Sequence, residues 1–117
     1  MRRLFWIGTS LDDLKAFPEE VRKEIGFSLQ LVQEGEKPPS AKPLKGFGGA
    51  SVLEIVEDFD SDTFRAVYTV RLRSGIYVLH AFQKKSTRGT KTPKREIDLI
   101  EARLKEAIED DKERSNQ

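Results

Sequence analysis

The sequence predicts an α+β fold, in which a small twisted antiparallel β-sheet packs against two N-terminal helices and one C-terminal helix. Apolar residues recur at helical spacing between residues 10 and 34 and again after residue 92, and strand-like patterns fill much of residues 51–84. The predicted order of elements is β-α-α-β-β-β-α. With 117 residues and no internal repeat or linker, the chain is expected to form a single domain spanning residues 1–117.

The N-terminal part of the chain predicts a strand followed by two helical segments. Residues 4–7 are short, apolar and aromatic, and Ser10 with Asp13 then marks a helix start. The helical pattern continues to about residue 34 as a helical hairpin or a kinked helix, with Pro18 suited to the start of its second part. Its apolar positions are Leu11, Leu14, Phe17, Val21, Ile25, Leu29 (or Ser28) and Val32.

The middle of the chain predicts the rest of the sheet. A short turn at Ser74 and Gly75 is expected to join the last two strands as a hairpin. The Gly-rich residues 46–49 lack the spacing of a nucleotide-binding loop. They are interpreted as a turn into the next strand, with the Phe47 side chain packed inward as an apolar plug. Three strands are expected, at residues 51–57, 63–73 and 75–84.

A last helix is expected after a polar, basic loop at residues 86–92. Thr92 is the expected N-cap, and Pro93 suits the first helical position. The C-terminal residues 110–117 are expected to fray. The apolar stripe of this helix consists of Ile97, Ile100, Leu104 and Ile108.

Composition excludes several kinds of chemistry. The chain has no cysteine, so disulfides, zinc–thiolate sites and thiol nucleophiles are excluded. With one histidine and no clustered, spaced carboxylates, neither a metal nor another cofactor is expected. The N-terminal apolar run stops at Gly8, too early for a signal peptide, and no segment approaches the ~20 apolar residues of a membrane span. We therefore expect a cytoplasmic protein without a membrane partner.

Positive charge is concentrated in the second half of the predicted sheet. From Asp62 to Arg95 there is one acid against nine bases, although the net charge of the chain is only +1. Alternation along a strand puts Arg65 and Arg71 on the face opposite the apolar residues, so both are expected on an open face. His80 and Lys84 share a face of the next strand. If the two faces coincide, they form a basic cleft suited to a phosphate backbone.

Such a cleft suits the transesterification of RNA. Arg and Lys can neutralise the phosphorane, while a His or Lys of suitable pKa can transfer the protons, and no metal is required. Each residue also has a structural interpretation. His80 could be a hydrogen-bonded core residue, Tyr68 and Tyr77 could serve packing, and Arg71 with Arg73 could solvate an edge strand. The basic residues at the end of the last strand and in the loop after it are interpreted as either solvated or phosphate-binding; they are Lys84, Lys85, Arg88 and Lys91.

Several segments resemble the phage-derived HigB-type toxins of the RelE/ParE superfamily. They are FPEEVRKEIG, AKPLKGFGG, VLEIVED, FRAVYTVR, YVLHAFQKKS and TPKREIDLIEARLK, and the resemblance covers roughly residues 4–108. It implies two N-terminal helices packed on a small twisted antiparallel sheet. It also implies the toxin half of a type II toxin–antitoxin pair, and most of the superfamily cleaves mRNA in the ribosomal A site without a metal.

The resemblance also implies roles for individual residues. Arg65 in FRAVY matches the phosphate-binding strand arginine, Lys45 in PLKG matches a basic residue before the first central strand, and Lys84 or Lys85 matches the basic end of the hairpin. Paired lysines of RelE are replaced by Glu54 and Val56, so the general base is either Glu54 or His80; Glu54 could also simply pair with Arg65. The residues expected to bind phosphate are Lys42, Lys45, Arg71, Lys85, Arg88 and Lys91.

The expected function is therefore a metal-independent, ribosome-dependent mRNA endoribonuclease that inhibits translation. Two alternatives stay open: a non-catalytic, ParE-like toxin that binds DNA gyrase, and a passive nucleic-acid-binding module. For a toxin, the expected partner is an antitoxin with a helix-turn-helix domain, and operator DNA is contacted only through that antitoxin.

Overall fold

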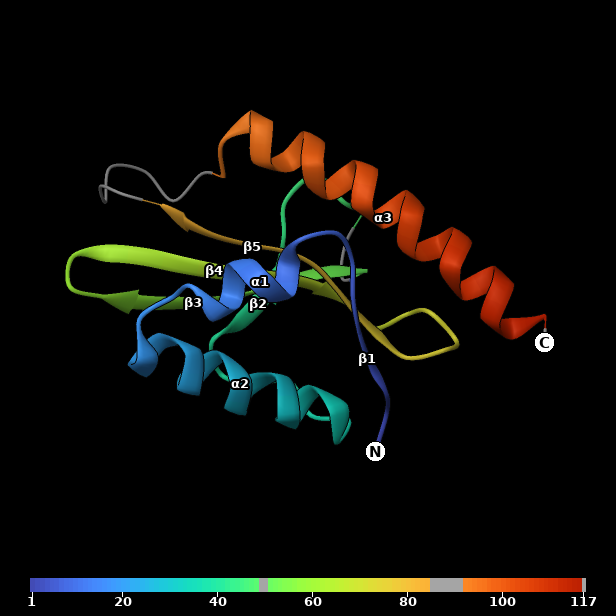
Figure 1. The fold of residues 1–117 in the computed structure, drawn as a ribbon, viewed down its shortest axis with the longest axis horizontal. Helices are drawn as coiled ribbons and strands as arrows, with labels where there is room; N and C mark the ends of the chain where they lie inside the picture. The colour runs from blue at the N-terminus through green and yellow to red at the C-terminus, as the bar shows by residue number, and fades with distance from the viewer. Residues whose placement is uncertain (49–50, 85–91, 117) are drawn as a thin grey trace.

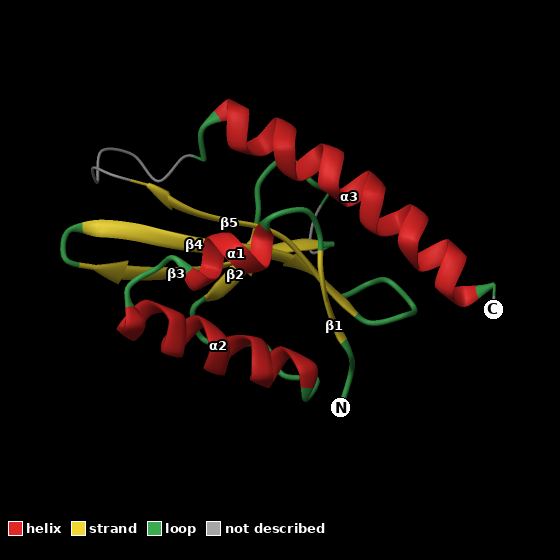
Figure 2. Ribbon diagram, in the orientation of Figure 1, coloured by secondary structure: helices red, strands yellow, loops and turns green. Residues whose placement is uncertain are grey.

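A five-stranded β-sheet forms the centre of the molecule, with helices on both of its faces (Figures 1 and 2). The computed structural model describes residues 1–48, 51–84 and 92–116. Their strands are β1 (Leu4–Trp6), β2 (Ala41–Pro43), β3 (Val52–Phe59), β4 (Asp62–Thr69) and β5 (Ile76–Lys84). The helices are α1 (Ser10–Lys15), α2 (Glu19–Gln33) and α3 (Lys94–Ser115).

The strands lie in the order β1-β5-β4-β3-β2. The β3–β4 and β4–β5 pairs are antiparallel, as predicted, and the β2–β3 pair is antiparallel too. The sheet is nevertheless mixed and not wholly antiparallel as predicted, because β1 joins β5 as a parallel edge strand. The α+β class and the positions of the helices are confirmed. Strand β2, which pairs with β3 through Ala41 opposite Ile55, was not predicted. A strand of three residues that includes Pro43 carries almost no periodic signal.

The connections within the sheet differ from the predicted ones. The tight hairpin turn is at Asp60 and Ser61, which have φ of 51° and 69° and join β3 to β4. The predicted turn at Ser74 and Gly75 is wrong, because β4 already ends at Thr69 and residues 70–75 form a longer loop. Arg2 binds three backbone carbonyls of this loop, which keeps the loop from continuing the strand ladder.

Helices α1 and α2 cover one face of the sheet with an apolar core. Every predicted apolar position of the two helices is buried except Leu11, which is half-buried. These helical residues pack on strand residues of the same face. The strand residues are Ala41, Leu53, Ile55, Phe64, Ala66, Tyr68, Ile76, Val78 and Ala81.

Helix α3 covers the opposite face, so the prediction that the Arg65 face is open is wrong. Ile100 and Ala107 of α3 are fully buried against a second core that includes Val67 and Leu79. The strand alternation is correct, but the face of Arg65 carries enough apolar surface to bind a helix of 22 residues. Within the described ranges, no helix is both long enough and apolar enough to cross a membrane.

Both ends of α3 also differ from expectation. Pro93, and not Thr92 as predicted, occupies the N-cap position, and no side chain caps the helix. The Thr92 hydroxyl accepts a hydrogen bond from Arg65. The helix continues through Ser115 instead of fraying from residue 110. Asp110 and Asp111 explain this extension, since both bind groups on the sheet side of the helix.

Candidate functional site

The predicted catalytic residues lie on one face of the sheet, the face beneath α3, which we call the site face. Glu54 of β3 lies opposite Val67 of β4, and Val67 lies opposite His80 of β5. Residues paired across neighbouring strands point to the same face. The register therefore meets the condition under which the Arg65 and His80 faces coincide. The charged or titratable positions in these rows are Lys42, Glu54, Arg65, His80 and Lys84.

A buried ion pair lies at the centre of the site face. Arg65 Nη1 donates to Glu54 Oε1 at 2.5 Å, and the two residues are 4% and 2% exposed. The same guanidinium nitrogen lies 3.3 Å from the Thr92 hydroxyl at the start of α3. The pairing of Glu54 with Arg65 was the structural alternative for Glu54, and it is confirmed. Arg65 is thus held in place between β3 and the beginning of α3.

Glu54 is surrounded by opposing electrostatic influences. Burial raises its pKa above the usual value, while the charges of Arg65, Lys42 and Lys84 act in the opposite direction. The net direction is upward, so this carboxylate is more basic than an exposed glutamate. The three cations come from three different strands, and all of them are close enough to influence the same carboxylate.

His80 is held at both ring nitrogens by residues of α3. Glu96 Oε2 lies 3.1 Å from Nε2, and Arg103 Nη1 lies 3.2 Å from Nδ1. Because a guanidinium can only donate, Nδ1 accepts and Nε2 carries the proton that is donated to Glu96. His80 is 5% exposed, and burial lowers its pKa, although Glu96 partly opposes this effect. The arrangement therefore favours a neutral imidazole.

Arg103 fixes the position of His80 and links α3 to the segment before α1. It donates to the Leu79 carbonyl at 3.0 Å and to the Thr9 hydroxyl at 3.0 Å. Gly8, with φ of 56°, lies so close that a Cβ atom would be 2.8 Å from Arg103 Nε. A glycine is therefore required for this approach.

Glu96 and Arg103 were not among the predicted site residues. Both are polar residues beside the predicted apolar stripe of α3, and their separation of seven residues puts them on the same helix face. That spacing was the available signal. Nothing in the sequence alone, however, indicates that this face lies over His80.

The other predicted phosphate-binding residues are less concentrated. Lys42 is exposed on β2 beside Glu54, and Lys45 is exposed in the loop that follows β2. The prediction that Arg71 shares the face of Arg65 is wrong, because Arg71 lies in the 70–75 loop beyond the end of β4. The remaining three, Lys85, Arg88 and Lys91, lie outside the described residues.

Two hollows lie near these elements. One, of about 520 Å³, is beside the start of α3 and is lined by Thr92, Pro93, Lys94 and Ile97. Thr92 contacts Arg65, so this hollow adjoins the buried ion pair. A second hollow, of about 370 Å³, lies at the end of α2, and its mainly apolar lining includes Val32, Leu53 and Tyr68. Among the described residues, no group of three His, Asp or Glu side chains could hold a metal ion.

Comparison with known proteins identifies the family. Residues 12–105 match the profile of the family described as phage-derived protein Gp49-like (DUF891). No curated protein sequence matches the chain. Among solved structures, the isolated RelE toxin of E. coli matches with a TM-score of 0.57 and 19% identity over 77% of this chain and 89% of that chain. The predicted resemblance is thereby confirmed for family and fold, and the chain belongs to the phage-derived Gp49-like family.

Proposed function

We propose that the chain is the toxin of a type II toxin–antitoxin pair and cleaves mRNA on the ribosome without a metal ion. Membership of the Gp49-like family and the RelE-like fold support this proposal. The observation that carries it is the convergence of Arg65, Lys42 and Lys84 around the buried carboxylate of Glu54. Cations gathered around one potential base are what phosphoryl chemistry on RNA requires.

In the proposed reaction, the ribose 2′-oxygen attacks the adjacent phosphorus while a base accepts its proton. The P–O bond to the 5′-oxygen then breaks, and the departing oxygen takes up a proton from water. Lys42, Lys84 and Arg65 stabilise the negative charge of the phosphorane. The products are a 2′,3′-cyclic phosphate and a 5′-hydroxyl.

Glu54 is the better candidate for the base. Burial raises its pKa, which increases its affinity for the proton. His80 accepts a hydrogen bond from Arg103 at Nδ1 and donates one to Glu96 at Nε2, so it can bind a proton only by giving up a partner. We assign His80 a positioning role, because it supports the strand face beside Glu54. The scissile phosphate is proposed to enter by the hollow at Thr92, next to Arg65.

The test compares variants of the site face with a matched control. Glu54→Gln is expected to lower mRNA cleavage about 10²–10⁴-fold, as removal of a general base does. Lys42→Gln with Lys84→Gln is expected to abolish growth arrest. The control, Arg22→Gln with Lys23→Gln, removes two positive charges from exposed positions of α2, as many as the Lys42 and Lys84 double variant removes. It is expected to leave mRNA cleavage and growth arrest unchanged. Cleavage at the wild-type rate by the Lys42 and Lys84 double variant would contradict the site assignment.

One feature of the site favours the non-catalytic alternative, a toxin that binds DNA gyrase. Arg65 and Glu54 are paired and buried, and His80 is engaged at both nitrogens. Pulse labelling after induction separates the two functions. The nuclease stops amino-acid incorporation first, whereas a gyrase poison first induces the response to DNA damage.

The proposed toxin acts in the cytoplasm and has a cognate antitoxin with a helix-turn-helix domain, encoded by the neighbouring reading frame. The antitoxin, and not this chain, contacts operator DNA. Co-expression of the neighbouring protein is expected to restore growth, and continued growth arrest with the two proteins present in equal amounts would contradict the pairing.

A further inference from the structure

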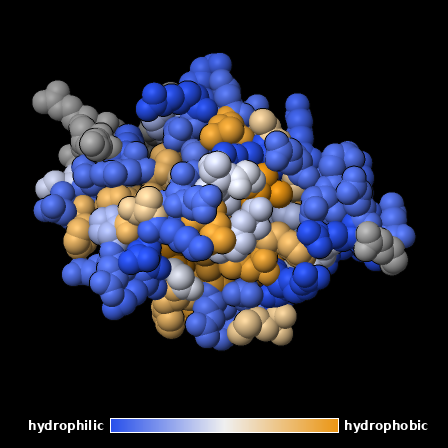
Figure 3. Space-filling model, viewed as in Figure 1, coloured by the Kyte–Doolittle hydropathy of each residue, from blue (hydrophilic) through white to orange (hydrophobic). Residues whose placement is uncertain are grey.

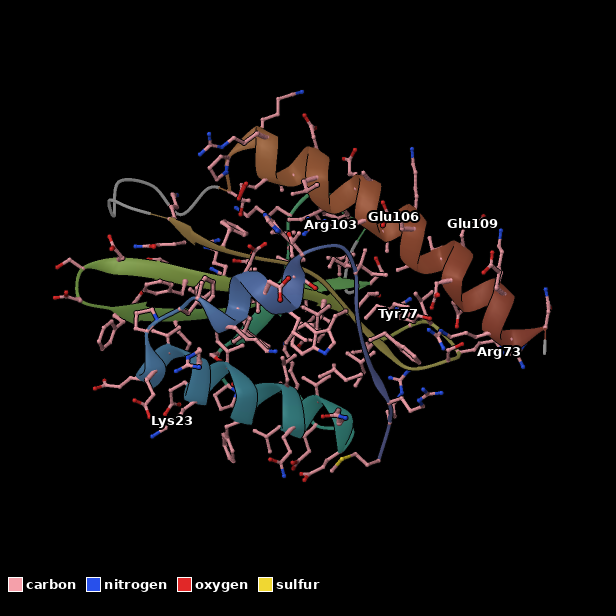
Figure 4. The ribbon with its side chains drawn as sticks, viewed as in Figure 1. Lys23, Arg73, Tyr77, Arg103, Glu106 and Glu109 are labelled. Carbon is pink, nitrogen blue, oxygen red and sulfur yellow. The ribbon has the colours of Figure 1, made fainter. Side chains whose placement is uncertain are left out.

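The 70–75 loop lies at the opposite end of the sheet from the β3–β4 turn, beside the C-terminal end of α3 (Figure 1). Its two arginines, Arg71 and Arg73, are both exposed. Figure 4 places Arg73 next to the last turns of α3, and Figure 3 shows a predominantly hydrophilic surface at this end of the molecule. Arg71 is six positions after Arg65 and lies beyond the end of β4 at Thr69, so the two residues are at most roughly 20 Å apart along the chain. The loop is therefore distinct from the site face.

The carbonyl groups of the loop are fixed by Arg2. Its Nη1 donates to Val70 O at 2.9 Å, and its Nη2 donates to Leu72 O at 2.9 Å and to Gly75 O at 3.2 Å. One guanidinium thus binds three carbonyls along six residues. A side chain at Gly75 would clash with this arrangement, because its Cβ atom would lie 2.5 Å from the Arg3 carbonyl oxygen.

The amide groups of the loop are fixed by Asp111 from α3. Its two carboxylate oxygens accept hydrogen bonds from the backbone N–H of Ser74, at 2.7 Å, and of Arg73, at 3.3 Å. Burial raises the pKa of Asp111, but these hydrogen bonds outweigh burial and leave the pKa below its usual value. The backbone that presents the two arginines is therefore held from both sides, which lowers the entropy lost when they bind a ligand.

Two carboxylates of α3 beside the loop already have hydrogen-bond partners. Asp111 binds the two amides, and Asp110 accepts hydrogen bonds from the Tyr77 hydroxyl and from Arg114. Within residues 1–48, 51–84 and 92–116, no carboxylate forms an ion pair with the guanidinium of Arg71 or Arg73. Arg73 lies close enough to Asp111 to lower the pKa of that carboxylate, and Arg71 is exposed at the hollow beside the end of α2, so the loop presents both cations to solvent.

We propose that the 70–75 loop is a second RNA contact, at which Arg71 and Arg73 bind backbone phosphates of a strand that also reaches the site face. This inference rests on the proposed function, because it concerns the same RNA. Planar guanidinium groups bind phosphate through two parallel hydrogen bonds. A polyanion with regularly spaced charges can meet two cationic surfaces up to roughly 20 Å apart, whereas a single phosphate or carboxylate cannot.

The test measures binding of an oligouridylate of about 20 nucleotides by fluorescence anisotropy over a range of salt concentrations. The oligouridylate carries 2′-O-methyl groups in place of its 2′-hydroxyls. These groups remove the nucleophile, so binding is measured without cleavage. Arg71→Gln with Arg73→Gln is expected to weaken binding and to reduce the slope of log K against log salt by about 1.4, since each lost single-strand phosphate contact contributes about 0.7. The control, Arg22→Gln with Lys23→Gln, removes the same charge from α2 and is expected to keep the wild-type slope.

Wild-type affinity and slope in the loop variant would overturn the proposal, as would an equal loss in the control, which would reveal a bulk charge effect. Binding to poly-L-glutamate is measured in parallel. If the loop variant loses binding to poly-L-glutamate but binds the oligonucleotide as the wild type does, the proposal is also overturned, because the loop would then bind an acidic protein. The nuclease function fails separately. If the wild-type protein cleaves no transcript but its oligonucleotide binding depends on the loop, the proposed cleavage is wrong and the RNA contact stands.

Discussion

The two faces of the sheet differ in what holds their helices. Beneath α1 and α2 the contacts are almost entirely apolar, with Ile25 and Ile55 fully buried. Beneath α3 a smaller apolar core is interrupted by polar contacts, among them the Arg65–Glu54 pair and the His80 contacts with Glu96 and Arg103. The first face thus holds its helices through apolar packing, while the second buries charged groups beside a smaller apolar core. Buried charge of this kind is a common sign of a functional site.

The largest effect is expected from breaking the buried ion pair. Arg65→Met leaves Glu54 charged and buried, which should lower the free energy of unfolding by about 3–5 kcal/mol. The double variant Arg65→Met with Glu54→Leu should recover most of that loss, because an apolar pair of similar volume is often neutral or stabilising. Urea denaturation at neutral pH measures both. A double variant no more stable than the single variant would show that the pair is structural.

A somewhat smaller effect is expected on the apolar face. Ile25→Ala removes a fully buried side chain of α2 and should lower the free energy of unfolding by about 2–5 kcal/mol. Oligonucleotide binding by the folded fraction should not change, because Ile25 lies on the face away from Arg65. A change in the salt slope of binding would show that the two faces are not separate in function.

Acid should destabilise the α3 face through His80. Burial lowers the pKa of His80 in the folded protein, so below its ordinary value of 6.5 the unfolded chain binds more protons. The contribution of His80 is therefore present above that pH and is lost as the pH falls below it, by at most about 1.4 kcal/mol per pH unit. His80→Gln should flatten the pH dependence measured by urea denaturation between about pH 7.5 and 5.5.

Glu54 does not obscure this comparison. The raised pKa of Glu54 changes stability in the opposite direction, because its contribution is lost as the pH rises above the ordinary pKa of a glutamate. This contribution is the same in the wild type and in the His80→Gln variant, so it cancels when the two are compared. Parallel pH profiles for the wild type and the His80 variant would mean that the imidazole is not held neutral by α3.

The smallest effect is expected at the far end of α3. Burial and the Asp110 carboxylate raise the pKa of Tyr77 to about 12, and the Tyr77 hydroxyl donates to Asp110 at 2.5 Å. Tyr77→Phe should cost about 1 kcal/mol, since the hydrogen bond is lost but Asp110 keeps its contact with Arg114. Hydrogen exchange of the Ser74 amide should accelerate only slightly, because Asp111 still holds it. A rapid loss of protection there would show that Tyr77 anchors the whole end of the helix.

The sequence predicted the apolar half of the fold better than the charged half. The stripe from Leu14 to Val32 is read from helical periodicity, and the strand faces follow from alternation, because both are local properties. The position of α3 over the site face is a tertiary choice, made by the burial of Ile100 and Ala107, and no local pattern encodes it. The 70–75 loop was missed for the same reason: Arg2, far away in sequence, binds its carbonyls.

The site was predicted in part. The shared face of Arg65, His80 and Lys84 follows from strand alternation once the register is known, and the register is known only from the structure. The partners that keep His80 neutral belong to α3, so they depend on a contact between distant segments. The roles of these residues in catalysis stay a prediction.

The most direct test of the central claim is the chemistry of the RNA ends formed when the protein is induced. Ligation that captures only 5′-hydroxyl ends, followed by sequencing, should reveal new ends at discrete positions within translated transcripts. These ends should disappear in the Lys42→Gln and Lys84→Gln double variant but not in the Arg22→Gln and Lys23→Gln control. Growth arrest without new ends, or new ends that carry a 5′-phosphate, would contradict attack by the 2′-oxygen at the site face.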